Sequence, residues 1–105
     1  MFEVDVCIRY WLYVLDLNNW NIETERISRE QVVFPEDIKI HEKYYVGISC
    51  DFKAKEAILY HDRIIAEEDI LHELLHIKFR NFSEKNINIL TKAFLNASNT
   101  EYPDV

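Results

Sequence analysis

The apolar residues of this chain follow two spacings, and each spacing predicts a different kind of element. Residues 2–17 begin as an alternation, but Asp5, Arg9 and Asp16 repeat at intervals of four and seven, which places them on one stripe of a helix. We therefore expect a largely buried N-terminal helix with an ion pair between Asp5 and Arg9. Segments that alternate, or that are aromatic and β-branched, predict strands at 20–27, 44–50 and 57–60. Residues 31–34 are also apolar and β-branched, and a turn follows them.

Two amphipathic helices are predicted in the last third of the chain. In the first, acidic residues gather at 67–69, where they suit a helix N-terminus, and the pattern ends near 79–81. Its apolar back consists of Ile70, Leu71, Leu74, Leu75 and Ile77. Ser83 is the expected N-cap of the second helix. The apolar stripe of that helix consists of Ile87, Leu90, Phe94 and Ala97. Residues 99–105 are polar and contain Pro103, so we expect them to form a non-helical tail.

These elements predict an α+β fold in a single domain of residues 1–105. A small mixed sheet would pack on the N-terminal helix, on the helix that begins near 67 and on the C-terminal helix. The content of 49% apolar and 13% aromatic residues is enough to fill a modest core, which argues against a disordered chain.

Charge and hydropathy narrow the expected partners and location. The net charge of −7, with no basic cluster, argues against a nucleic-acid partner. The longest apolar run, residues 10–15, is too short to cross a membrane. Glu3 and Asp5 stand where a signal peptide would carry lysines, so we expect a cytoplasmic protein.

One stretch of the first amphipathic helix has the residue types and the spacing of a catalytic metal site. His72 and His76 are four residues apart, so a helix places both on one face, where they can bind the same ion. Glu73 lies about 100° further round, beside the pair, and suits a general base better than a third ligand. This is the arrangement of the His-Glu-x-x-His zinc peptidases, in which the glutamate takes a proton from the attacking water.

A catalytic zinc ion needs a third protein ligand. No histidine follows His76, and we expect the upstream His41 and His61 at the surface rather than on the metal. A downstream carboxylate is therefore required, and we favour Glu84, because it opens the next helix eight residues past His76. The alternative for Glu84 is a residue that only complements its own helix dipole. The next candidates for the third ligand are Glu101 and then Asp104.

Other residues near the motif have weaker expected roles. Asp69 lies one turn before His72 and is either an acceptor for a histidine ring N–H or simply first-turn charge. Residues 56–60 are expected to form the strand edge that pairs with an extended substrate. Tyr60 and Tyr102 are candidate oxyanion partners, although most tyrosines in small domains are core or surface filler.

The segment from Ile70 to Lys78, with the strand before it, resembles the minigluzincins, a family of very short zinc peptidases. It is also similar to the catalytic domains of integral-membrane metallopeptidases, such as the CAAX-processing and β-lactam-sensor proteases. The resemblance covers about residues 44–97 and implies a zinc ion, peptide-bond hydrolysis, metal ligands at His72 and His76, and a base at Glu73. The chain departs from related short folds at Phe82, near which they carry a histidine. Family members resemble precursors kept inactive by a C-terminal segment, a role that residues 99–105 could fill.

We therefore expect a zinc metalloendopeptidase that acts on peptide or protein substrates and is held latent by its C-terminal tail. The tail could act within its own chain or on the neighbour in a homodimer. Two alternatives are a non-catalytic zinc-binding interaction module, closed by a fourth ligand, and a repressor-cleaving regulatory protease.

Overall fold

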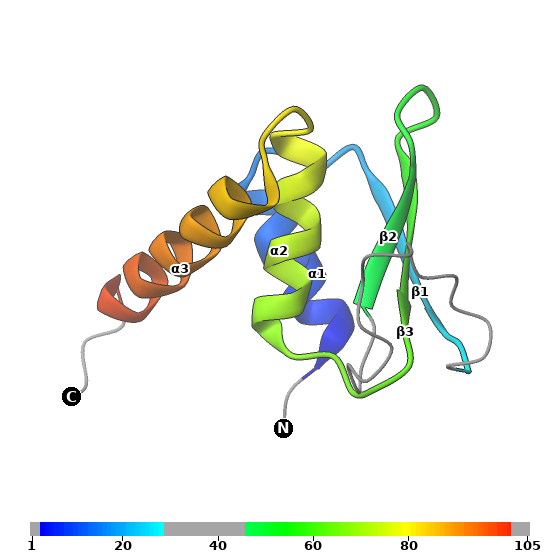
Figure 1. The fold of residues 1–105 in the computed structure, drawn as a ribbon, viewed down its shortest axis with the longest axis horizontal. Helices are drawn as coiled ribbons and strands as arrows, with labels where there is room; N and C mark the ends of the chain where they lie inside the picture. Colours follow the sequence, from blue (N-terminus) through cyan, green and yellow to red (C-terminus); the bar gives the residue numbers. More distant parts are fainter. Residues whose placement is uncertain (1–2, 29–45, 102–105) are drawn as a thin grey trace. The chain divides into compact units, whose positions relative to one another are not determined.

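The structure, a computed structural model, describes residues 3–28 and 46–101, the last three of these by their backbone alone. These residues contain three helices and a small mixed sheet, which confirms the predicted α+β class (Figure 1). The elements are α1 (Val4–Val14), β1 (Asn21–Arg26), β2 (Val46–Asp51), β3 (Glu56–His61), α2 (Glu67–Lys78) and α3 (Glu84–Glu101). They belong to two compact units, a helical unit formed by residues 1–18 with 66–105 and a sheet unit formed by residues 19–65. The single-domain prediction is not tested by this division, and the expected strand at 31–34 lies outside the described residues.

The sheet unit has the strand order β1-β3-β2, with β1 parallel and β2 antiparallel to β3. The β2–β3 hairpin turns at Asp51, whose Oδ1 accepts hydrogen bonds from the backbone N–H groups of Lys53 and Ala54. Lys55 then takes a left-handed backbone conformation, with φ of 57°. Each of the three strands was predicted. However, residues 56–60 are not a sheet edge, because β3 is hydrogen-bonded to a strand on each side. The prediction that this segment pairs with substrate is therefore wrong.

In the helical unit, α1 ends in a Schellman motif. The Leu17 N–H donates to the Leu12 carbonyl oxygen (2.7 Å), and the Asp16 N–H donates to that of Tyr13 (3.2 Å). Asp16 itself is left-handed, with φ of 57°, at the position that glycine usually occupies in this motif. The helix is less buried than we predicted, since Val6 and Tyr13 are exposed on its outer side. The expected ion pair also takes another form, because Arg9 Nε donates to the backbone carbonyl oxygen of Asp5 (3.4 Å) rather than to its carboxylate.

Helix α2 contacts both other helices of its unit. Against α1, the Trp11 indole N–H donates to the Glu67 carboxylate (2.9 Å), while the Trp11 ring meets Phe94 of α3 edge to face. Four side chains of α2 have no exposed surface: Ile70, Leu71, Leu74 and Leu75. The predicted apolar back of α2 is therefore confirmed.

The second predicted helix is longer and differently buried than its pattern suggested. Residues 99–101 continue α3, so the tail predicted at 99–105 is wrong for its first three residues, and residues 102–105 lie outside the described part. Along α3, Ile87 is buried as expected, whereas Ala97 is exposed and Thr91 takes a buried place. The Thr91 hydroxyl donates to the Ile87 carbonyl oxygen (2.8 Å), which lets a polar residue occupy the apolar face.

Among the described residues, no helix combines the length and the apolar composition that crossing a bilayer requires.

Candidate metal centre

The two histidines lie on one side of α2. Because they are one helical turn apart, their rings lie beside each other, with centroids 4.8 Å apart. Their Nε2 atoms point at the same place and are separated by 3.2 Å. Both side chains are half-buried. The spacing of His72 and His76 in the sequence thus produces the convergence that we predicted for two ligands of one ion.

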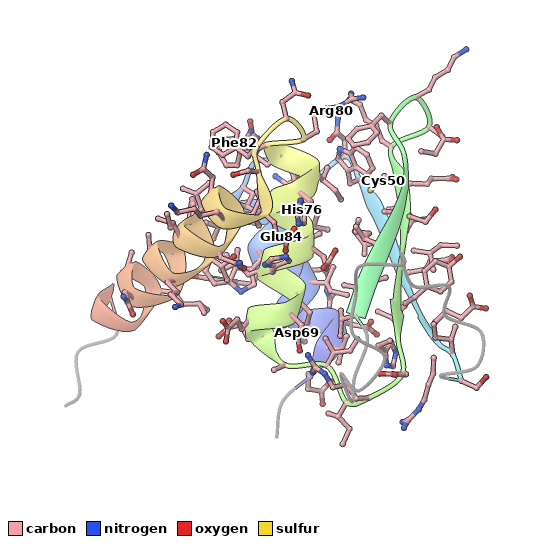
Figure 2. The ribbon with its side chains drawn as sticks, in the orientation of Figure 1. Cys50, Asp69, His76, Arg80, Phe82 and Glu84 are labelled. Carbon is pink, nitrogen blue, oxygen red and sulfur yellow. The ribbon has the colours of Figure 1, made fainter. Side chains whose placement is uncertain are left out.

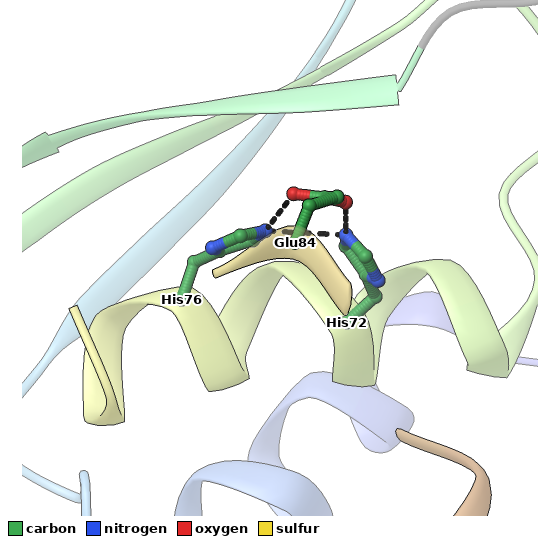
Figure 3. A group of neighbouring side chains, drawn as sticks. All are labelled: His72, His76 and Glu84. Carbon is green, nitrogen blue, oxygen red and sulfur yellow. Dashed lines mark hydrogen bonds and ion pairs between the residues drawn. The ribbon is translucent and has the colours of Figure 1, made fainter. Parts of the chain in front are cut away.

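Glu84 completes this group from the first turn of α3 (Figure 3). Its Oε1 lies 2.6 Å from His72 Nε2, and its Oε2 lies 3.0 Å from His76 Nε2. The carboxylate therefore spans both rings instead of pointing along its own helix. The group His72, His76 and Glu84 is a candidate metal site of the described chain. Figure 2 shows the same approach of Glu84 to His76 among the other side chains.

The donor set fits a divalent metal in both geometry and chemistry. Three ligand atoms bound tetrahedrally at about 2.0–2.1 Å would lie about 3.3 Å apart. The Nε2–Nε2 separation of 3.2 Å already matches this value, and with one atom from each residue the three ligand atoms lie within 4.8 Å of one another. Two neutral imidazoles and one carboxylate are also a common ligand set of catalytic zinc.

Among the described residues, neither Glu101 nor His61 belongs to this group. Helix α3 rises about 1.5 Å per residue, so the backbone of Glu101 lies about 25 Å along the helix from that of Glu84. Asp104, Tyr102 and His41 lie outside the described residues. His61 belongs to the sheet unit, where its Nδ1 lies 2.8 Å from the Arg63 carbonyl oxygen, and Tyr60 is half-buried in β3.

Glu73 is a buried carboxylate beside the group. It is only 8% exposed, and its Oε1 lies 3.9 Å from His72 Nε2. Burial first, then the Glu84 carboxylate and Asp69, raise the pKa of Glu73 from 4.5 to about 8 in the metal-free protein. A bound cation would oppose this rise. Such a group can both accept and return a proton near neutral pH.

The electrostatics also favour the neutral form of His76, which is the form that binds metals. Burial lowers the pKa of His76 below its ordinary value, and the neighbouring His72 adds to this effect, while Glu84 opposes both.

Asp69 has a local task in this structure. Its Oδ2 accepts a hydrogen bond from the Ala66 N–H (2.8 Å), and so closes the start of α2. Because Ala66 has no side-chain acceptor, only this half of a capping box is formed. This contact agrees with the second role expected for Asp69, that of an acidic residue in the first turn of the helix.

Sequence reasoning gave no role to the connection between α2 and α3. Phe79 and Phe82 face each other there, with ring centroids 4.9 Å apart and planes inclined by 32°. The sequence predicted a break between the two helices here, and the separation of the two phenylalanines by three positions was the available signal for their contact.

No protein-family model, curated protein or solved structure matches this chain. Every functional assignment therefore depends on the geometry of the chain itself.

Proposed function

We propose that this protein is a zinc-dependent peptidase whose metal is held by His72, His76 and Glu84. The observation that carries the proposal is the convergence of two imidazole nitrogens and one carboxylate from two helices, within 3.2 Å of one another. The position of Glu73 beside this group supports a catalytic rather than a purely structural site. A purely structural zinc site does not require a buried carboxylate that is not a ligand, and burying such a group destabilises the fold.

Each residue has a defined task in this proposal. His72, His76 and Glu84 would hold a zinc ion, which would supply Lewis-acid polarisation of the substrate carbonyl and make water a better nucleophile. Glu73 accepts the proton of the attacking water and returns it to the amine that leaves when the peptide bond breaks. Burial of Glu73 keeps bulk water away from its carboxylate, so that its proton is exchanged with the reacting groups.

The main alternative is a zinc-binding interaction module, in which a fourth protein ligand closes the site. The candidate group in the described chain has three members, and three protein ligands are the number typical of catalytic zinc. The number of ligands therefore supports a peptidase over an interaction module. A repressor-cleaving protease would use the same site, and no structural feature favours it. The net charge of −7 favours peptide over nucleic-acid substrates.

Latency through the C-terminus is part of the proposal, and the length of α3 favours its intermolecular form. Residue 101 lies about 25 Å along the helix from residue 84. Residues 102–105 would span at most about 14 Å if fully extended, so these four residues are too short to reach back to the metal site of their own chain. For residues 99–105 as the blocking segment, we therefore propose that they act on a second copy, with a homodimer as the latent form.

Hydrolysis of unfolded protein by zinc-loaded chains tests the proposal. We expect a chain shortened to residues 1–101 to cleave denatured casein, and a chelator to stop the reaction. The same chain with Glu73→Gln should retain zinc without cleavage, because an amide cannot accept the proton. Absence of cleavage by the zinc-loaded shortened chain would support the interaction module instead. If the full-length chain cleaved casein as fast as the shortened chain, the proposal that the C-terminus keeps the enzyme latent would be refuted.

A further inference from the structure

The third ligand reaches the site through a five-residue connection, residues 79–83, which joins α2 to α3 (Figure 2). The Phe79 N–H donates to the Leu75 carbonyl oxygen (2.8 Å) and ends α2. The Phe82 N–H then donates to the Phe79 carbonyl oxygen (2.9 Å), while the rings of these two residues lie against each other. The chain reversal is thus fixed by a backbone bond and by an aromatic pair.

The residue after this pair fixes the start of α3. The Ser83 hydroxyl accepts a hydrogen bond from the Asn86 N–H (3.2 Å), and the Ser83 carbonyl oxygen accepts one from the Ile87 N–H (3.0 Å). These are the contacts of an N-cap, as predicted for Ser83. Glu84 is therefore the first residue of the helix, and the position of the Ser83 N-cap sets the direction in which the Glu84 side chain leaves the helix.

Packing places the α3 helix but does not enclose the Glu84 side chain. Of the described side chains of α3, only Ile87 and Thr91 are buried. The Glu84 side chain is itself 65% exposed, so no surrounding core restricts its position. The short connection from α2 therefore acts on Glu84 directly, whereas the packing contacts of α3 lie further along the helix, at Ile87, Thr91 and Phe94.

Losing the constraint from this connection would have a large effect, because each residue of a helix turns the side-chain direction by a large angle. A shift of the helix start by one residue would rotate the side chain at position 84 by about 100° around the axis. Its carboxylate would then move by several Å, beyond reach of both Nε2 atoms. His72 and His76 would keep their places, since both belong to α2.

We infer that Phe82 and Ser83 are positioning residues of the metal site: the Phe79–Phe82 pair and the Ser83 cap place the Glu84 carboxylate on the metal. This inference rests on the proposed zinc site and extends it. Phe82 is 44% exposed, so core packing does not account for its large side chain. The Phe82 ring instead contacts the Phe79 ring, and this contact holds the connection between the two helices in one conformation.

The test measures zinc affinity of Phe82→Ala and Ser83→Ala in full-length protein, by competition with a chelator at a temperature where each variant is folded. We expect each change to weaken zinc binding about three- to tenfold, and the double variant about 10- to 100-fold. Phe82→Tyr and Ser83→Thr keep the ring and the cap, and should bind as wild type does. Ile89→Ala removes a similarly exposed apolar side chain (57%) from α3 and is the matched control, with affinity unchanged.

A second readout separates positioning from general stability. Cobalt in place of zinc reports its coordination through its visible absorption, so loss of the Glu84 ligand should change the spectrum of the double variant in the same direction as Glu84→Ala. Unchanged affinity and an unchanged cobalt spectrum in the double variant would overturn the inference, even if its melting temperature falls. If wild type bound no zinc, the proposed function would fail instead, and the two failures are thereby distinguished.

Discussion

Replacing Glu73 with glutamine should stabilise the metal-free protein, although it removes the proposed catalytic base. The carboxylate is 8% exposed, and its pKa is raised from 4.5 to about 8 by burial, Glu84 and Asp69. A group with a raised pKa in the folded state contributes its full stability below the unfolded-state value, about pH 4.5, and loses it as the pH rises toward 8. At pH 7 this linkage costs wild type on the order of 3 kcal/mol.

The neutral amide removes this cost but is itself a buried polar group, which offsets about 1 kcal/mol. We therefore expect Glu73→Gln to be more stable than wild type by about 2 kcal/mol at pH 7, or about 10 °C in melting temperature. At pH 4 the advantage should disappear, because wild-type Glu73 is then protonated in both states.

Thermal unfolding followed by circular dichroism, with a chelator present, measures this difference at both pH values. Glu68→Gln is the matched control, since Glu68 is an exposed carboxylate in the first turn of the same helix and should change stability by less than about 0.5 kcal/mol. Equal melting temperatures of wild type and Glu73→Gln at pH 7 would refute the reasoning. So would a gain that persisted unchanged at pH 4.

Two further predictions concern the helical unit. Glu67→Ala should cost about 1–3 kcal/mol in denaturant unfolding, because it leaves the indole N–H of the buried Trp11 without its acceptor, whereas Glu68→Ala should cost far less. A cost equal to that of Glu68→Ala would show that the Trp11–Glu67 bond adds no stability. Asp16→Gly should raise stability by about 0.5–1 kcal/mol, since Asp16 is a left-handed residue and an acidic one at a helix C-terminus. Asp16→Ala, which lacks the backbone freedom of glycine, should not raise it, and equal melting temperatures of the two variants would contradict this account.

The convergence of the two histidines was predictable because it depends on local geometry. His72 and His76 are neighbours on any helix, so their sequence spacing was sufficient. Glu84 was favoured because it opens the next helix eight residues past His76 and because few carboxylates follow that histidine. The structure adds the contacts of the chain reversal, the Phe79–Phe82 pair, which bring the second helix back to the first.

The errors in prediction came from features that a local pattern does not encode. Residues 56–60 were expected at a sheet edge, but β1, more than thirty residues earlier in the chain, pairs with them in parallel, and nothing in the short apolar run specifies that partner. The helical tail at 99–101 was missed because the polar residues before Pro103 were interpreted as a break, although proline restricts mainly the residue just before it. The exposure of Val6 and Tyr13 depends on where α2 and α3 lie, which the sequence of α1 does not contain.

A crystal structure of the protein grown with zinc, with an anomalous difference map at the zinc edge, tests the central claim most directly. The account predicts one peak per chain, bonded at about 2.0–2.1 Å to His72 Nε2, His76 Nε2 and a carboxylate oxygen of Glu84, with no fourth ligand from the same chain. Glu73 should stand next to the ion without binding it. A zinc ion elsewhere, or one closed by a fourth side chain of its own chain, would contradict a catalytic metal at this site.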